Sequence, residues 1–115
     1  PWFGGTYDML IEIDGEHWLV DFKTSNHITI NYFLQLAAYR YMLWREKKII
    51  LRGAIILQVS KTEINYNEYS LDFAITDQYN FIESCTNTFF GMVYAYHNLA
   101  ISEQMFNTYM KGEKK

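Results

Sequence analysis

The sequence predicts a mixed α/β fold in which a mixed β-sheet is flanked by helices, and three features carry this prediction. Two apolar-rich runs meet at an Asp-Gly dipeptide, which is typical of a β-hairpin. A long segment with helical character follows, and after it comes a short apolar run typical of a buried strand. A polar strand and a second helical segment complete the order ββαββα, which we expect to form a single domain over residues 1–115.

The first two strands are predicted from the Asp14-Gly15 turn. Both positions of a two-residue type I′ turn need positive φ, and Asp-Gly meets that requirement better than most pairs. The flanking strands would be Tyr7–Ile13 and Glu16–Lys23. The two residues beside the loop then pair with each other, and the same register puts Asp8 directly opposite Asp21.

This register separates the hairpin into two faces, because side chains alternate along a strand. One face is apolar apart from a glutamate at the turn, and it consists of Tyr7, Met9, Ile11, Ile13, Glu16, Trp18, Val20 and Phe22. The other face consists of Asp8, Leu10, Glu12, His17, Leu19, Asp21 and Lys23. Directly opposed carboxylates destabilise a sheet unless something neutralises them, and a divalent cation would do so. The alternative is an ordinary surface ion pair between Asp21 and Lys23.

The helix after the hairpin is expected from about Ile30 to Lys48, with Thr29 or Asn31 as its N-cap. The segment that follows, Arg52–Ser60, contains four consecutive apolar residues and reads as a central strand. A more polar strand around Glu63–Tyr69, extending as far as Phe73, suits the edge of a sheet.

The final helix is predicted to begin near Thr76-Asp77. Its apolar residues recur at helical spacing, at Phe81, Ile82, Cys85, Phe89, Met92, Val93, Tyr96 and Leu99. Ser102–Met110 either continues this helix or forms a separate short one, and the tail Lys111–Lys115 is expected to be frayed.

Three short segments near the start of the chain resemble a known family. They are GGTYD (Gly4 to Asp8), VDFKTS (Val20 to Ser25) and QLAAY (Gln35 to Tyr39), in that order. Together they resemble the PD-(D/E)XK nuclease superfamily, and most closely its RecB-like and Cas4-like exonuclease branch, which includes viral and mitochondrial members. The resemblance covers about residues 4 to 39. It implies a restriction-endonuclease-like sandwich and a metal-dependent DNA exonuclease.

The resemblance also implies a catalytic role for three side chains. Asp8 and Asp21 would hold Mg²⁺ or Mn²⁺ together with the backbone carbonyl of Phe22, because such ions prefer hard oxygen ligands. Lys23 would orient the attacking water and stabilise the developing negative charge.

Four further residues are implied in substrate binding. Gln35 and Tyr39 lie four apart, so a helix would place them one turn apart on one face beside the site. Core packing is a serious alternative for Tyr39, since its helix reads as apolar nearly all round, and in such a helix the Gln35 amide would need a polar partner. Thr24 and Ser25 would bind phosphate or simply form a turn.

The expected substrate is DNA, as single strands or duplex ends, and partner chains of a replication or recombination complex are implied. A net charge of −3 argues against a surface that binds nucleic acid all over. Basic residues do gather near the end of the first helix and the start of the next strand, at Arg40, Arg45, Lys47, Lys48 and Arg52. Favourable charge at a helix C-terminus explains Arg45 to Lys48 at least as well.

Composition excludes several other classes. The single cysteine, Cys85, cannot form an internal disulfide or hold the four-cysteine iron–sulfur cluster of some relatives. No apolar stretch approaches the roughly 18 residues that span a bilayer. We therefore expect a soluble intracellular protein without membrane contact, in the cytoplasm or nucleoid of a bacterium or phage-infected cell.

Two competing functions stay open. The family often carries an additional Glu or His ligand on an upstream helix, which we expect to be missing because the sequence starts at Pro1 almost within a strand. Without that ligand, the domain could keep the fold as an inactive nucleic-acid-binding or scaffold module. A site-specific restriction-type endonuclease is the third candidate, and the helix with Gln35 and Tyr39 favours the exonuclease over it.

Overall fold

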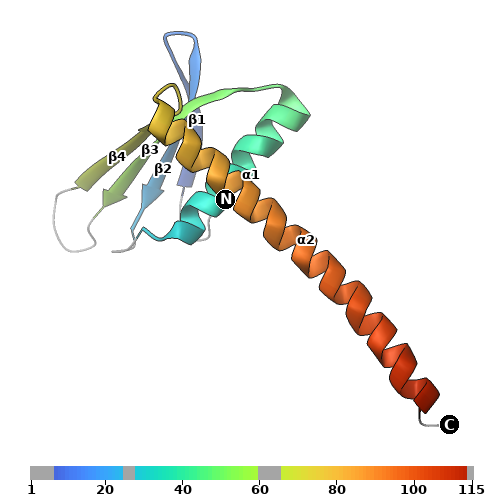
Figure 1. The fold of residues 1–115 in the computed structure, drawn as a ribbon. Coiled ribbons are helices and arrows are strands. Elements are labelled where there is room, and N and C mark those ends of the chain that lie inside the picture. Colours follow the sequence, from blue (N-terminus) through green and yellow to red (C-terminus); the bar gives the residue numbers. More distant parts are fainter. Residues whose placement is uncertain (1–6, 25–27, 60–65, 114–115) are drawn as a thin grey trace.

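The computed structural model describes residues 7–24, 28–59 and 66–113. It confirms a mixed α/β protein with a four-stranded mixed sheet and two helices (Figure 1). The elements in chain order are β1 (Tyr7–Ile13), β2 (Glu16–Lys23), α1 (Ile30–Lys47), β3 (Leu51–Val59), β4 (Tyr66–Asp72) and α2 (Thr76–Glu113).

The four strands lie in sequence order, so β2 and β3 are the interior strands of the sheet. β1 pairs with β2 and β3 with β4 in antiparallel fashion, whereas β2 and β3 are parallel. A parallel pair needs a crossover connection, and α1 supplies it. The predicted central strand is β3, and β4 is an edge strand as expected.

The hairpin between β1 and β2 has the predicted turn and register. Asp14 and Gly15 both have positive φ, 52° and 80°, as a type I′ turn requires. Asp8 pairs with Asp21, which confirms the direct opposition of the two aspartates in the ladder.

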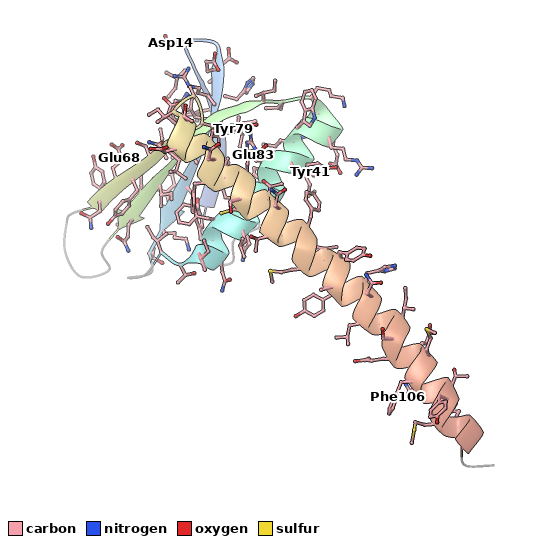
Figure 2. All side chains as sticks on the ribbon, in the orientation of Figure 1. Asp14, Tyr41, Glu68, Tyr79, Glu83 and Phe106 are labelled. Carbon is pink, nitrogen blue, oxygen red and sulfur yellow. The ribbon has the colours of Figure 1, made fainter. Side chains whose placement is uncertain are left out.

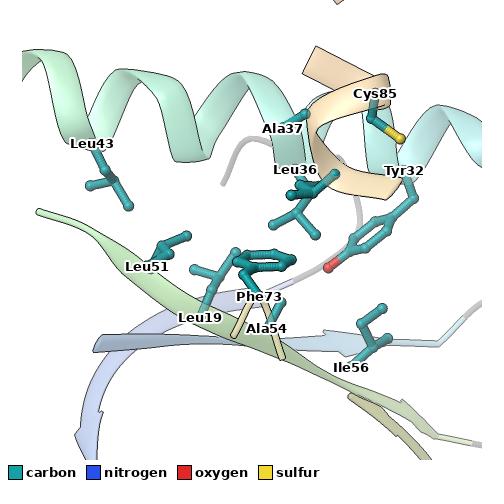
Figure 3. Packing of buried hydrophobic residues seen from close by; sticks show 11 residues of the cluster. Leu19, Tyr32, Leu36, Ala37, Leu43, Leu51, Ala54, Ile56, Phe73 and Cys85 are labelled. Atoms are coloured by element: carbon teal, nitrogen blue, oxygen red, sulfur yellow. The ribbon is translucent and has the colours of Figure 1, made fainter. Parts of the chain in front are cut away.

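The hydrophobic core lies on one face of the sheet, and both helices contribute to it (Figure 3). Its residues are Leu19 from β2, Tyr32, Leu36, Ala37 and Leu43 from α1, Leu51, Ala54 and Ile56 from β3, Phe73 after β4, and Ile82 and Cys85 from α2. Leu19 and Asp21 share this face, so the helices cover the face that carries the acidic residue. On the apolar face of the hairpin, Met9 is 52% exposed, whereas Val20 is buried.

The boundaries of α1 agree with the prediction of a helix from about Ile30 to Lys48. Thr29 is its N-cap, although the Thr29 side chain makes no cap hydrogen bond, and Lys48 is its C-cap in the left-handed conformation (φ 57°). The amide of Lys48 donates to the carbonyl of Trp44, which closes the helix as in an αL cap. The described part of β4 begins at Tyr66, and residues 60–65 lie outside the described residues.

The helix α2 is continuous from Thr76 to Glu113, so Ser102–Met110 continues it. Fraying of Lys111, Gly112 and Glu113 was expected and is wrong, because the helix extends through all three. Among the described residues, no helix is long and apolar enough to cross a membrane.

Candidate functional site

The centre of the candidate site is Asp21, a carboxylate with 0% of its surface exposed. It lies on the interior strand β2, where its neighbours in the ladder are Asp8 on β1 and Ile56 on β3. A carboxylate in the interior is costly unless nearby groups compensate its charge. Its complete burial distinguishes it from the other acidic residues of the hairpin with a described side chain, Glu12, Asp14 and Glu16, which are all exposed.

Lys23 follows Asp21 by two residues and so lies on the same face of β2. Its ammonium nitrogen is 4.6 Å from the centroid of the Tyr32 ring, within the range of a cation–π interaction. Tyr32 belongs to the first turn of α1 and is buried, and its ring meets Phe33 edge to face. Figure 3 shows the Tyr32 hydroxyl pointing toward the sheet. Sequence reasoning missed Tyr32, whose only signal was its place in an apolar run.

Gln35 and Tyr39 lie one turn apart on α1, as predicted. Gln35 is exposed, so the idea that its amide is buried and needs a polar partner is wrong. The reason is that α1 buries only a stripe of its surface, at Tyr32, Leu36, Ala37, Ala38 and Leu43. Tyr39 is half-buried and packs against the core cluster, in agreement with the packing alternative.

The remaining predicted residues lie at the end of β2. Phe22 is half-buried and pairs with Tyr7 and Leu57, on the face opposite to Asp21. Thr24 is exposed directly after the strand, and Ser25 lies outside the described residues.

The predicted basic cluster is divided among several partners. Arg40 forms an ion pair of 3.0 Å with Glu83 of α2, and Arg52 forms one of 2.7 Å with Asp72 at the end of β4. The Asp72 partnership raises the pKa of Arg52 through a side-chain hydrogen bond. Arg40 and Arg52 thus join structural elements, and neither contributes its charge to a common phosphate-binding surface.

A cavity of ≈ 690 Å³ lies one strand away from the aspartate pair. Its lining includes Ile56 and Gln58, which pair with Asp21 and Lys23 across the β2–β3 ladder. Phe33 and Tyr69 supply aromatic walls. The cavity therefore adjoins the candidate site through β3, and its wall is mixed, because the polar residues Glu68 and Ser70 also line it.

Comparison with known proteins gives no relative. No family model matches the chain, and neither a curated protein nor a solved structure is detectably similar to it. Within the described residues, no three His, Cys, Asp or Glu side chains are grouped as ligands of one metal ion.

Proposed function

We propose that the chain is the core of a metal-dependent deoxyribonuclease of the PD-(D/E)XK kind, an exonuclease that hydrolyses phosphodiester bonds with an activated water. The observation that carries the proposal is the direct pairing of Asp8 with Asp21, with Lys23 two residues further along the same strand. Opposed carboxylates have no favourable role in a bare sheet, because like charges repel across a ladder. A cation site gives them one.

The residues present suit Mg²⁺ or Mn²⁺. The Asp8 and Asp21 carboxylates would hold the ion, with the Phe22 carbonyl as a third oxygen. Magnesium commonly binds through one or two carboxylates and keeps several waters, so a site with two acidic side chains is sufficient. When bound, such an ion lowers the pKa of a coordinated water and offsets charge on the scissile phosphate.

The chain's own residues supply the rest of the chemistry. The Lys23 ammonium, held over the Tyr32 ring, would orient the water and stabilise negative charge as it develops on the phosphate. Gln35 is exposed on α1 and Thr24 is exposed after β2, so both are accessible to a DNA strand. Tyr39 would act mainly by packing α1 in place.

The complete burial of Asp21 favours a second candidate function. A carboxylate that holds a metal ion must be accessible to that ion, whereas an inactive nucleic-acid-binding or scaffold domain has no such requirement. The net charge of −3 also fits weak affinity for phosphate. Isothermal titration with Mn²⁺ separates the two candidates, since only the enzyme needs a metal site at Asp21.

The decisive experiment is cleavage of end-labelled single-stranded and double-stranded DNA with Mn²⁺. We expect Asp21→Asn to lose activity by roughly 10²-fold or more, since one of the two carboxylates that would hold the metal ion is removed. Asp14→Asn is the matched control, because it makes the same change in the loop of the same hairpin, where Asn also tolerates positive φ. Equal cleavage by wild type and Asp21→Asn would overturn the proposal.

A further inference from the structure

The second half of α2 exposes large apolar side chains along a helix that extends away from the sheet (Figures 1 and 2). Tyr96 is 71% exposed, Leu99 52% and Phe106 60%. Apolar patches of this extent on a protein surface mark a site of interaction. Where α2 extends past the end of α1, no other element in the described part of the chain packs against it.

The exposed residues continue a row of side chains that is buried in the core at the start of α2. We call this row the seam. Ile82 and Cys85 of α2 pack into the core cluster, and Phe89 follows them half-buried. With the alternating spacing of three and four residues, the same seam then continues through Met92, Tyr96, Leu99, Glu103, Phe106 and Met110. This is the a/d pattern of a coiled coil, sustained over about four heptads. The helix α1 covers the beginning of the seam. Because α1 ends at Lys47, the later part of the seam extends past it.

The charges of this segment restrict what can cover it. Between Thr88 and Met110 the side chains of Lys and Arg are absent from the sequence, and His97 and Glu103 are the only His, Asp or Glu. Nucleic acid and anionic membrane surfaces are bound through cationic side chains, which this segment lacks. An apolar helix of complementary spacing is the partner that fits.

We propose that the partner is a second copy of this chain, bound through an antiparallel pair of α2 segments over Met92–Met110. In an antiparallel coiled coil, each a position faces a d position of the other helix. One register matches the whole segment with itself: Met92 faces Met110 of the second copy, Tyr96 faces Phe106, and Leu99 faces Glu103. The seam is self-complementary in this register.

The antiparallel direction follows from Glu103. In a parallel pair, the two Glu103 carboxylates would meet in one layer and repel each other, whereas the antiparallel pair places each against Leu99. Antiparallel helices also align their dipoles favourably. The segment is about 28 Å long at 1.5 Å per residue. This inference does not depend on the nuclease proposal.

The test is the mass of the full chain in solution, by light scattering or sedimentation. We expect twice the 13.7 kDa of one chain. Leu99→Glu should give the mass of one chain at the same concentration, since in the antiparallel register it puts a second carboxylate directly opposite Glu103 of the second copy. The control Gln104→Glu adds the same charge away from the seam and should leave the dimer intact. A wild-type monomer, or a dimer that Leu99→Glu does not weaken, would overturn the proposal.

Disulfide cross-linking tests the direction of the helices. Tyr96→Cys and Phe106→Cys variants should cross-link when mixed, because these positions face each other in the antiparallel register, and neither should cross-link alone. In a parallel pair each position faces the same position of the other copy, so each variant would cross-link alone. That result would overturn the proposed arrangement. The native Cys85 will not interfere, because it is buried and burial raises the pKa of its thiol, so that little reactive thiolate forms.

Flotation with vesicles of phosphatidylcholine and phosphatidylglycerol tests the competing apolar partner. We expect wild-type protein to stay with the soluble fraction. If the chain were monomeric and floated with the vesicles, and Leu99→Glu abolished flotation, the seam would be a lipid-binding surface and the dimer proposal would be wrong.

Discussion

At the scale of single residues, the position of Lys23 allows binding to be separated from chemistry. Its ammonium lies over the Tyr32 ring on the face that carries Asp21. We expect Lys23→Ala to lose most cleavage and to keep nearly the same DNA affinity. In the proposed mechanism the Lys23 charge acts on the transition state, and the substitution removes only one phosphate contact from the ground state. Single-turnover cleavage and fluorescence anisotropy with labelled DNA measure the two effects. Cleavage at the wild-type rate would remove the mechanistic role of Lys23.

Gln35 offers the opposite case, in which binding should change first. Because its side chain is exposed, Gln35→Ala should change the free energy of unfolding by no more than about 0.5 kcal/mol. If the amide contacts the substrate, DNA affinity should fall and cleavage should fall with it. Unchanged affinity and unchanged cleavage would exclude a substrate contact by this residue.

Asp21 links metal binding to stability. Mn²⁺ that binds only the native state should stabilise it, by about 2.7 kcal/mol at a concentration of 100 times the dissociation constant. We expect this gain to disappear in Asp21→Asn and to persist in Asp14→Asn, as measured by thermal unfolding with and without Mn²⁺. An equal gain in wild type and Asp21→Asn would place the metal elsewhere.

The residues of the site differ in how far the sequence could predict them. The pairing of Asp8 with Asp21 was predictable, because turn chemistry and strand alternation are local. The contact between Lys23 and Tyr32 was not, since it depends on how the crossover helix lies on the sheet. For the same reason the sequence could not show which stripe of α1 is buried, and the exposure of Gln35 was missed.

At the scale of secondary structure, Gly53 permits close packing around β3. A Cβ atom at this position would collide with the Leu71 carbonyl oxygen on β4 and with the ring of Trp18 on β2. Backbone cannot yield as a flexible side chain does, so Gly53→Ala should destabilise the fold by about 1–3 kcal/mol. Gly91→Ala is the control: its Cβ meets nothing within 4 Å, and alanine favours a helix by up to about 1 kcal/mol. Urea unfolding of both variants checks the contrast.

The junction of β4 and α2 should make stability sensitive to acid. The pKa of Asp72 is lowered, first by its hydrogen bond from Arg52 and then by the Ala74 amide. A lowered folded-state pKa means that the carboxylate stabilises the fold above its unfolded pKa and that this contribution is lost as the pH falls through the folded value. Asp72→Asn should therefore weaken the fold near neutral pH and lose less stability than wild type as the pH falls below the unfolded pKa of Asp, about 4. If the free energy of unfolding falls equally with pH in wild type and variant, this prediction is wrong.

Element positions were predictable where a local signal marks them. The Asp-Gly turn fixed the hairpin, and the apolar run of β3 identified a central strand. The sequence did not decide whether α2 continues through Ser102–Met110, because this stretch contains no Gly or Pro that would end a helix but has polar residues, such as Ser102 and Asn107, that are also common at helix ends. Its helical state follows from propagation of an already formed helix, which costs little for each added residue.

At the scale of the whole molecule, the chain has two parts of different local stability. The sheet, α1 and the first half of α2 share one core, whereas the second half of α2 has few neighbours in the described chain. Segments with few buried contacts open at a low free-energy cost. The long dimension of the molecule, 66 Å against 37 Å and 25 Å, reflects this projecting helix.

Dimerisation would remove this weakness and make stability depend on protein concentration. For a chain that is more stable as a dimer, mass action favours the folded state by up to about 1.4 kcal/mol for each tenfold rise in concentration. We expect the melting temperature to rise over a hundredfold range of wild-type concentration, with amides of Met92–Met110 becoming protected from hydrogen exchange over the same range. Gln104→Glu should behave like wild type. Leu99→Glu should show a constant melting temperature and unprotected amides, because its carboxylate would face Glu103 of the second copy and repel it. If the wild-type melting temperature is also constant and these amides exchange freely at every concentration, the projecting half of α2 does not pair with a second copy.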